Sequence, residues 1–435
     1  MLVGLILFIV LLVLYDVSLH PPTKYLLVID CGLRTSKFSL FEYSDFYGRS
    51  NAWVRQRSYS TISPGISSFA DNSTAGAEAI LQEANAVITG GVPPGCRKNT
   101  RIFLGAVAGV RMLEKTNAEK AQALVEAVRS TLAGSASEGV VMSRMEDVGV
   151  VSGADEGFYA WLAVNYLRGK FGKENSDSPH NPSSMLGALN LDGASTQITF
   201  VPETKGEMNK TAFGQEYNLY SRSHLCYGVA TIRARYLARL TEVSDLQGAP
   251  PNIVFEGDYN SMRCGQAIDE IFKAGSFATY HRPSLRGDFA AINKVWEIVN
   301  SFITVGTSGK VSLTEFSAEI DKFCGEKWVA VSVSLNSKLL ANLTLSHHFH
   351  SPSLYLFCAC QIEGIAMFYA ANWYLLTSLT ITRRFMDGSP KDKCLQGWMV
   401  KGLLEAYEFK SDSGWSTVTF LGNVSSIFAF SIMYE

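Results

Sequence analysis

The stretch Tyr25-Leu-Leu-Val-Ile-Asp-Cys-Gly32 decides the fold, because a continuous apolar run ends in an acid and is followed by a glycine. Residues 38–43, Phe-Ser-Leu-Phe-Glu-Tyr, then alternate between apolar and polar side chains. A buried run, a tight turn and an alternating run indicate a strand, a loop and a second strand.

The same strand-loop-strand pattern occurs a second time later in the chain. Residues 186–192, Leu-Gly-Ala-Leu-Asn-Leu-Asp, form a second apolar run, Gly193-Ala-Ser-Thr196 turns the chain, and 197–201 follow as a strand. Apolar residues at helical spacing predict helices over 120–132, 155–170 and 312–323. Mixed strands and helices with a repeated strand-loop-strand unit predict an α/β protein with two similar lobes.

Three domains are expected along the chain. Residues 1–20 are a signal sequence or an N-terminal membrane anchor, and residues 24–147 form an N-terminal lobe, with 410–435 as candidates to complete it. Residues 148–409 form a C-terminal lobe, in which 331–391 are an atypical insertion without evident periodicity.

Charge and the N-terminus limit the partners and the compartment. The chain has 435 residues and a formal net charge of -2, so no broad positive field favours nucleic acid, and a small anion held locally is the expected partner. The apolar run over residues 2–15 is shorter than the roughly 20 residues of a membrane span. It predicts entry into the secretory pathway, with the protein secreted or membrane-anchored in the Golgi or at the cell surface; a buried N-terminal helix is the alternative. The glycosylation sequons at Asn72, Asn209, Asn342 and Asn423 are compatible with this route.

Two glycine-bearing turns are candidates for holding a phosphate chain. Backbone N–H groups in a tight loop of small residues can approach phosphate oxygens closely, and a cation spreads the developing charge. A single glycine after a strand is more often a plain turn, so the prediction depends on the pair. The predicted phosphate-binding residues are Gly32, Arg34, Thr35 and Ser36 in the first loop and Asp192, Gly193, Ala194, Ser195 and Thr196 in the second.

Hydrolysis also needs a base that orients and deprotonates water. Asp155 and Glu156 follow Ser152-Gly153 at the predicted start of a helix, where a carboxylate can project into a cleft. The alternative is that both acids only complement the positive end of the helix dipole.

The ordered motifs resemble the ecto-apyrases, or nucleoside triphosphate diphosphohydrolases. The resemblance covers most of residues 25–324 and implies two actin/hexokinase-like (ribonuclease H-like) lobes with a nucleotide cleft between them. The motifs that carry it are Val28-Ile-Asp-Cys-Gly32, Phe103-Leu-Gly-Ala-Val-Ala-Gly-Val-Arg-Met-Leu113, Val151-Ser-Gly-Ala-Asp-Glu-Gly-Phe-Tyr-Ala-Trp161 and Ala188-Leu-Asn-Leu-Asp-Gly-Ala-Ser-Thr-Gln197, with similar segments at 217–228 and 283–289.

The resemblance implies an enzyme that releases the terminal phosphate of nucleoside di- and triphosphates with Ca2+ or Mg2+. Glu156 matches the family's catalytic base, Ser195 the residue that helps hold the attacking water, and Gln197 a position near that water. Asp30 matches the acid that holds the cation through water. Trp296 falls near an aromatic residue that stacks on the nucleotide base; a core tryptophan is the alternative.

Several positions depart from the family pattern. Leu33 and Arg34 stand where the family has paired serines, although Arg34 can supply a charge-assisted contact. Asn190 replaces the second metal-site acid, while Asp192, which we predict as a cation ligand, stands where glycine is usual. The family's fifth region is not found after residue 423. A catalytically impaired nucleotide-binding relative is therefore the main alternative, and a kinase-like or polyphosphate-cleaving enzyme of the same superfamily is the next.

The eight cysteines have no zinc-type spacing, so disulfides are the better interpretation in an oxidising compartment. The resemblance implies a disulfide between Cys324 and Cys394. Cys226 and Cys264 match family cysteines whose partners are absent, so we expect them to pair with each other.

Overall fold

The computed structural model describes residues 23–44, 54–134, 147–171, 181–243, 260–277, 280–326, 390–422 and 424. The predicted N-terminal segment 1–20, the insertion up to residue 389, and Cys358, Cys360, Asn342 and Asn423 lie outside these residues. Within them, no helix is both long enough and apolar enough to cross a membrane.

The chain divides into two compact units. The first runs to Ser184 and adds Asn209–Asn218, and the second comprises Met185–Met208 and Leu219–Val424. The division therefore falls later than the predicted boundary at 147/148. Helix α5 (Gly153–Leu167) belongs to the first unit because Glu156 pairs there with Arg111.

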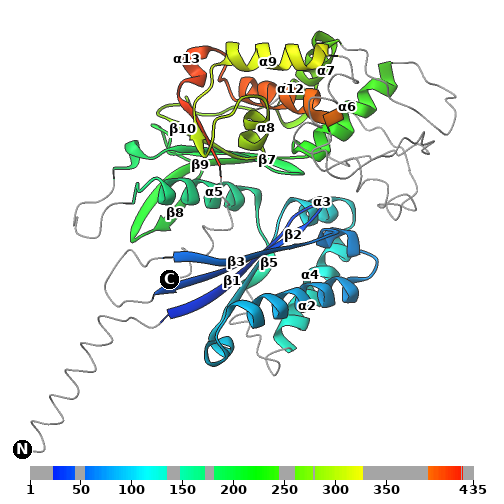
Figure 1. The fold of residues 1–435 in the computed structure, drawn as a ribbon, viewed down its shortest axis with the longest axis vertical. Coiled ribbons are helices and arrows are strands. Elements are labelled where there is room, and N and C mark those ends of the chain that lie inside the picture. The colour runs from blue at the N-terminus through cyan, green and yellow to red at the C-terminus, as the bar shows by residue number, and fades with distance from the viewer. Residues whose placement is uncertain are drawn as a thin grey trace, which may run out of the picture. The chain divides into compact units, whose positions relative to one another are not determined.

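The first unit is built on a five-stranded sheet, drawn in blue to cyan in Figure 1. β1 lies at its centre, antiparallel to β2 and parallel to β4. The predicted strands at 25–30 and 38–43 are confirmed as β1 and β2. The strands, in sheet order, are β3 (Val54–Ile62), β2 (Ser36–Ser44), β1 (Thr23–Cys31), β4 (Arg101–Ala106) and β5 (Val148–Val150).

Helices cover one face of this sheet with the larger apolar core of the unit. The core joins alternate β1 residues such as Leu27 and Ile29 to Ile80 of α2 and Leu124 of α4. The predicted helix at 120–132 is confirmed as part of α4. The helical elements are η1 (Ile66–Phe69), α2 (Ser73–Gly91), η2 (Pro94–Asn99), α3 (Ala108–Thr116), α4 (Ala118–Gly134), α5 and η5 (Pro182–Ser184).

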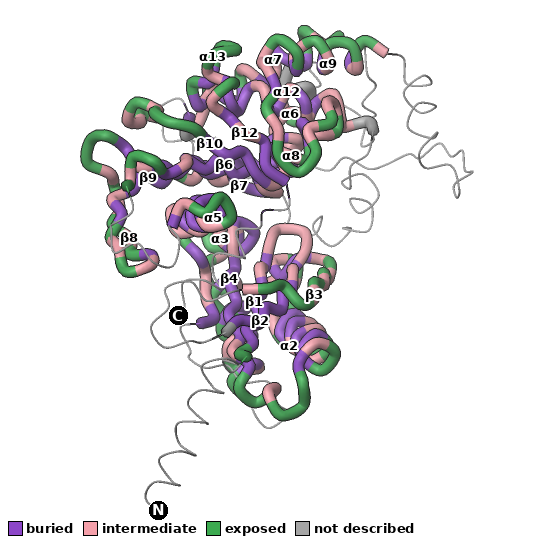
Figure 2. Tube along the Cα trace, turned by 60° about the vertical axis from the view of Figure 1, so that its left-hand side comes forward, coloured by how far each residue is buried: buried purple, intermediate pink, exposed green. Residues whose placement is uncertain are grey.

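The second unit is built on a seven-stranded sheet around β6, all five residues of which are buried (Figure 2). Full burial explains why this strand is a continuous apolar run. The predicted strands at 186–192 and 197–201 are confirmed as β6 and β7. The strands, in sheet order, are β11 (Ser308–Gly309), β12 (Val418–Leu421), β10 (Phe289–Asn293), β6 (Gly187–Leu191), β7 (Ser195–Phe200), β9 (Gln215–Leu225) and β8 (Met208–Ala212).

The helices of the second unit pack on this sheet through a large apolar core that contains Trp415. The predicted helix at 312–323 is confirmed as α9. The segment 410–435 was expected to complete the N-terminal lobe, but its described part contributes β12 to the sheet of the second unit; residues 425–435 lie outside the described residues. The helical elements are α6 (Val229–Val243), α7 (Ser261–Phe272), η6 (Gly275–Phe277), α8 (Lys294–Phe302), α9 (Leu313–Gly325), α12 (Pro390–Ala406) and α13 (Asp412–Trp415).

The two units repeat one topology. In each, a central strand is antiparallel to the strand that follows it, and a later strand, β4 or β10, joins its other side in parallel. Asp30 pairs with Lys37 across the first hairpin, as Asn190 pairs with Gln197 across the second. The register therefore makes Asp30 and Asn190 equivalent positions.

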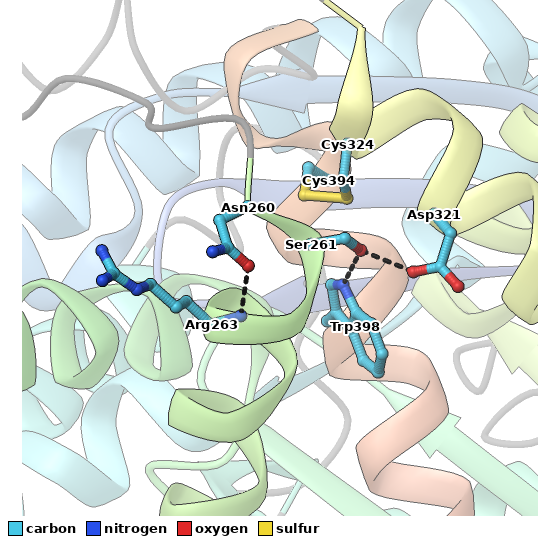
Figure 3. Close-up of a disulfide and its surroundings, with 7 residues drawn as sticks. All are labelled: Asn260, Ser261, Arg263, Asp321, Cys324, Cys394 and Trp398. Atoms are coloured by element: carbon cyan, nitrogen blue, oxygen red, sulfur yellow. Dashed lines mark hydrogen bonds between the residues drawn. A yellow bond between two sulfur atoms is a disulfide. The ribbon is translucent and has the colours of Figure 1, made fainter.

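The predicted disulfide between Cys324 and Cys394 is confirmed, and it joins α9 to α12 (Figure 3). The predicted pairing of Cys226 with Cys264 is wrong. Cys226 is disulfide-bonded, whereas Cys264 keeps its thiol among the buried residues of α7.

Candidate functional site

The first predicted phosphate loop is a four-residue turn between β1 and β2. Gly32 N–H donates to Thr35 O at 2.9 Å, which closes the turn. A Cβ on Gly65 would lie 2.5 Å from Leu33 O, and one on Gly109 would lie 2.8 Å from Leu33 Cα. Only glycine fits at these two positions, so the turn is fixed by close backbone contact with the segments before η1 and at the start of α3.

The side chains of this turn have different surroundings. Gly32, Arg34 and Thr35 are partly exposed, as phosphate contact requires. Ser36 is buried next to the strand residue Cys31, and burial raises the pKa of the Cys31 thiol to about 12. Asp30 is largely buried, with Lys37 Nζ 3.9 Å from its Oδ2.

The second predicted loop is the equivalent turn between β6 and β7. Asp192 N–H donates to Ser195 O at 3.0 Å. The three carbonyl oxygens of residues 192–194 accept hydrogen bonds from the backbone N–H groups of Val229, Ala230 and Cys226 at 2.8–2.9 Å. These bonds fasten the turn to the start of α6. A Cβ on Gly228 would lie 2.3 Å from Ala194 N, so this contact also requires glycine.

A chain of side-chain amides runs beneath the second turn. Asn293 Nδ2 donates to Asn190 Oδ1 at 2.7 Å. Asn190 Nδ2 donates to Asp192 Oδ2 at 2.6 Å and to Gln197 Oε1 at 2.8 Å. Gln197 Nε2 donates in turn to Ser195 Oγ at 2.8 Å. The structure thus brings together Asp192, Ser195 and Gln197, three residues predicted from the sequence, in one continuous hydrogen-bond network.

Thr196 and Trp296 lie apart from this network. Thr196 is buried and donates to Asn190 O at 2.7 Å, so its side chain supports the strand. Trp296 is half-buried on α8, with its indole Nε1 donating to Gly306 O at 2.8 Å. A Cβ on Gly422 would lie 2.5 Å from its ring, so one part of the indole packs against that glycine.

The two acids at the start of α5 have separate surroundings within the first unit. Both oxygens of Asp155 are engaged, Oδ1 by Lys210 Nζ at 2.6 Å and Oδ2 by Ser152 Oγ at 2.7 Å. Glu156 is only 4% exposed, and its Oε2 accepts from Arg111 Nη2 on α3. Asp155 therefore stabilises the helix start, whereas Glu156 is a buried carboxylate held by a guanidinium.

Three residues that contact predicted ones were missed by the sequence analysis, namely Arg111, Ser223 and Asn293. Arg111 lies in the first turns of the helix after β4, and Asn293 ends β10, the equivalent strand of the second unit. Ser223 accepts from Gln197 Nε2 at 3.2 Å. A polar residue directly after an apolar strand was the available signal for Asn293.

The oxygen atoms present suit a hard divalent cation bound largely through water and phosphate. Among the described residues, no group of three or more His, Cys, Asp or Glu side chains could hold a metal ion. Mg2+ commonly binds through one or two carboxylates together with substrate phosphates. Asp192, with one oxygen fixed by Asn190, fits that kind of ligand set.

Comparison with known proteins agrees with these arrangements. The sequence model of the GDA1/CD39 (nucleoside phosphatase) family matches residues 17–350. Ectonucleoside triphosphate diphosphohydrolase 8 of Bos taurus is 30% identical over 373 residues, covering 73% of this chain and 72% of that protein. Ectonucleoside triphosphate diphosphohydrolase 1 of Mus musculus is 24% identical over 453 residues, covering 92% of this chain and 78% of that protein.

Similarity to a solved structure supports the fold. A crystal structure of nucleoside triphosphate hydrolases from Neospora caninum superposes with a TM-score of 0.57 at 12% identity, covering 92% of this chain and 88% of that one. The predicted α/β fold with two similar units is therefore confirmed. The match over residues 17–350 and the 30% identity to ectonucleoside triphosphate diphosphohydrolase 8 of Bos taurus show that the chain belongs to the GDA1/CD39 (nucleoside phosphatase) family.

Proposed function

We propose that this protein hydrolyses nucleoside di- and triphosphates, releasing the terminal phosphate by attack of water with Glu156 as the general base. The observation that carries the proposal is the contrast between the two adjacent acids. Asp155 is partly exposed and is held by Lys210 and Ser152, whereas the Glu156 carboxylate is buried and is oriented by the guanidinium of Arg111. A carboxylate oriented in this way can take a proton from water as the phosphorus–oxygen bond forms.

The remaining roles follow from the two turns and the amide network. Ser195 and Gln197 orient the attacking water, and the backbone of residues 32–36 and 192–196 binds phosphate oxygens. Arg34, half-exposed on the first turn, supplies a positive charge. Interactions of this kind lower the barrier because they strengthen as negative charge develops in the transition state.

Family members generally depend on a divalent cation, and we propose Ca2+ or Mg2+ here, held by the carboxylates of Asp30 and Asp192. When bound, such a cation neutralises charge on the phosphate oxygens. Trp296 is our proposed platform for the nucleotide base, since its indole N–H is already satisfied and fixes the plane of the ring.

For the location we propose the secretory pathway, with the protein secreted or anchored in the Golgi or cell-surface membrane through its N-terminal segment. The apolar run at residues 2–15, the sequons and the Cys324–Cys394 disulfide support this location. Disulfides persist in oxidising compartments.

The test compares two substitutions at neighbouring positions. We expect Glu156→Gln to reduce phosphate release from ATP and UDP, with Ca2+ or Mg2+, by at least about 100-fold, since general-base catalysis contributes 10²–10⁴-fold. The amide still accepts from Arg111 but leaves the buried guanidinium without its counter-charge, so the unfolding midpoint should fall, and it is measured in parallel to show that the variant is folded under the assay conditions. Asp155→Asn is the matched control and should keep most of the activity. Activity retained in Glu156→Gln would remove that residue from the role.

The alternative, a catalytically impaired relative that only binds nucleotide, is distinguished by the same assay on the parent protein. It would bind ATP, ADP, UDP or GDP without releasing phosphate. Hydrolysis of any of these nucleotides rules out this alternative. Polyphosphate in the same panel tests the other alternative, a kinase-like or polyphosphate-cleaving enzyme.

A further inference from the structure

The amide network under the second turn has a fixed direction. A carboxamide donates through its nitrogen and accepts through its oxygen. Asn293 donates to Asn190, Asn190 donates to Gln197, and Gln197 donates to Ser195. Each amide in this series therefore determines the orientation of the next.

The residue at position 190 sets this direction. An ionised acid has no hydrogen to donate, so an aspartate there would accept from Gln197 and turn the Gln197 carbonyl toward Ser195. With Asn190, the Gln197 nitrogen faces Ser195 Oγ instead, at 2.8 Å. Ser195 accepts from Gln197, and its own hydroxyl hydrogen is directed elsewhere.

The second hydrogen of Asn190 fixes a carboxylate. Asn190 Nδ2 lies 2.6 Å from Asp192 Oδ2, two residues along the chain. In the register of the hairpins, Asn190 is the equivalent of Asp30, and Asp192 lies within the turn itself. The second unit thus carries its acid two positions later than the first unit does.

Asn293 shows an independent sign of a constrained role. Its backbone has φ 53° and ψ −125°, in the region that side-chain-bearing residues rarely adopt. Such a conformation is strained and occurs most often at functional sites. It places the Asn293 amide at the end of β10, where it holds the Asn190 carbonyl.

We propose that Asn293 and Asn190 are positioning residues. In the second unit the acid is at position 192 instead of 190, and the two amides compensate by holding Asp192 as a cation ligand and Gln197 as a donor to Ser195. This inference rests on the proposed function, because the cation and the water belong to that reaction. It adds Asn190 and Asn293 to the residues proposed for that reaction, and it gives the Asn190 amide the role of orienting the Asp192 carboxylate.

The test measures cation binding directly, with Mn2+ as a spectroscopic probe for Ca2+ or Mg2+ and with the full chain. We expect Asn293→Ala and Asn190→Leu to weaken Mn2+ binding, measured by electron paramagnetic resonance, by about 10–100-fold, the usual effect of removing a residue that orients a metal ligand. Asn300→Ala is the matched control, because it also removes a neutral side-chain amide from the second unit. The Asn300 Oδ1 accepts from the backbone N–H groups of Val305 and Gly306 and not from the amide network, so Mn2+ affinity should stay unchanged.

An exchange of the two positions separates positioning from simple structural support. In Asn190→Asp/Asp192→Gly the acid returns to position 190, where Asn293 Nδ2 can still donate to it. We expect this double variant to regain most of the Mn2+ affinity lost in Asp192→Gly alone. Its kcat for phosphate release should stay below that of the parent, because an acid at position 190 turns the Gln197 carbonyl toward Ser195. Adding Asn293→Ala to the double variant should remove the recovered affinity.

The outcomes distinguish the inference from the proposed function. Unchanged Mn2+ affinity in both Asn293→Ala and Asn190→Leu overturns the positioning role, as does an exchange variant that binds no better than Asp192→Gly. Thermal unfolding of each variant shows whether it is folded. If Asn190→Leu is not, Asn190→Gln, which keeps the amide on a longer side chain, replaces it, and it should also bind Mn2+ more weakly than the parent. If the parent binds Mn2+ as expected but releases no phosphate from any nucleotide, the proposed function fails while the inference stands.

Discussion

Glu156 and Arg111 form a buried pair of opposite charges, and such a pair is seldom a net source of stability. Removing two charges from water costs several kcal/mol for each ion, which the mutual attraction only partly offsets. The guanidinium side chain is 11% exposed and the carboxylate 5%, so both groups carry this cost. A pair retained under these conditions is better explained by the orientation it gives to the Glu156 carboxylate.

His224 is a second buried titratable residue, and it lies outside the proposed chemistry. Its ring stacks on Phe277 with the centroids 3.9 Å apart and lies near Tyr280 and Tyr407. Burial, and to a lesser extent the positive charge of Arg222, lowers the pKa of His224 to about 3. Tyr280 and Tyr407 are neutral phenols at neutral and acidic pH, and burial raises the pKa of each further above this range.

This shift predicts a loss of stability in mild acid. Between pH 6.5 and pH 3 the unfolded chain binds a proton at this histidine that the folded chain does not, so the free energy of unfolding falls as pH falls. From pH 6.5 to pH 5 the expected loss is about 2 kcal/mol, at 1.36 kcal/mol for each pH unit. Urea unfolding at the two pH values measures it.

His224→Phe should remove this part of the pH dependence, since the aromatic packing is kept and the titrating group is lost. His281→Gln, at an exposed position, is the control and should leave the dependence unchanged. If the free energy of unfolding falls with pH equally steeply in His224→Phe and in the parent, His224 is not the group responsible.

At the level of the element, the sequence predicted most of the strands and helices that frame the site. The runs at 25–30 and 186–192 were recognisable because both strands are central and buried, so they lack polar alternation. Arg111 and Asn293 were missed because their partners lie 45 and 103 residues away in sequence, and only the fold brings them together. The placement of α5 was missed because its contacts with Arg111 and Lys210 are also distant in sequence.

The disulfide is the element-level feature with the clearest effect on stability. Cys324 and Cys394 are separated by 70 residues and link α9 to α12. Close by, Ser261 at the start of α7 donates to Asp321 Oδ1 at 2.7 Å and accepts from Trp398 Nε1 at 3.1 Å, so three helices meet there (Figure 3). The crosslink therefore fixes a junction as well as a long loop.

We expect Cys324→Ser/Cys394→Ser to lower the free energy of unfolding by about 2–4 kcal/mol, because a crosslink across a long loop restricts the unfolded chain. Urea unfolding with and without a reducing agent measures the effect, and the double variant should no longer respond to reduction at this site. Cys96→Ser, at a partly exposed thiol, is the control and should leave the midpoint unchanged. A double variant as stable as the parent would show that the hydrogen bonds among α7, α9 and α12 suffice.

At the scale of the whole molecule, the two units present the same hairpin turn from the same place in the same topology. Gly32–Thr35 and Asp192–Ser195 each close with one backbone hydrogen bond, yet each is fixed by different neighbours in its own unit. The first turn abuts Gly65 and Gly109, whereas the second is bonded to the start of α6. The proposed mechanism therefore requires that one bound nucleotide contacts both turns at the same time.

Hydrogen exchange tests this requirement without any substitution. We expect a non-hydrolysable nucleoside triphosphate analogue with Mg2+ to slow hydrogen exchange in the peptides that contain residues 32–36 and 192–196. Backbone N–H groups that are bonded to phosphate oxygens are exposed to exchange less often. Helix α2, whose buried face packs on the first sheet, should exchange at the same rate with and without nucleotide, so it is the internal control. If only one of the two turns becomes protected, the nucleotide engages a single unit, and the proposed mechanism, which draws Glu156 from one unit and Ser195 from the other, is wrong.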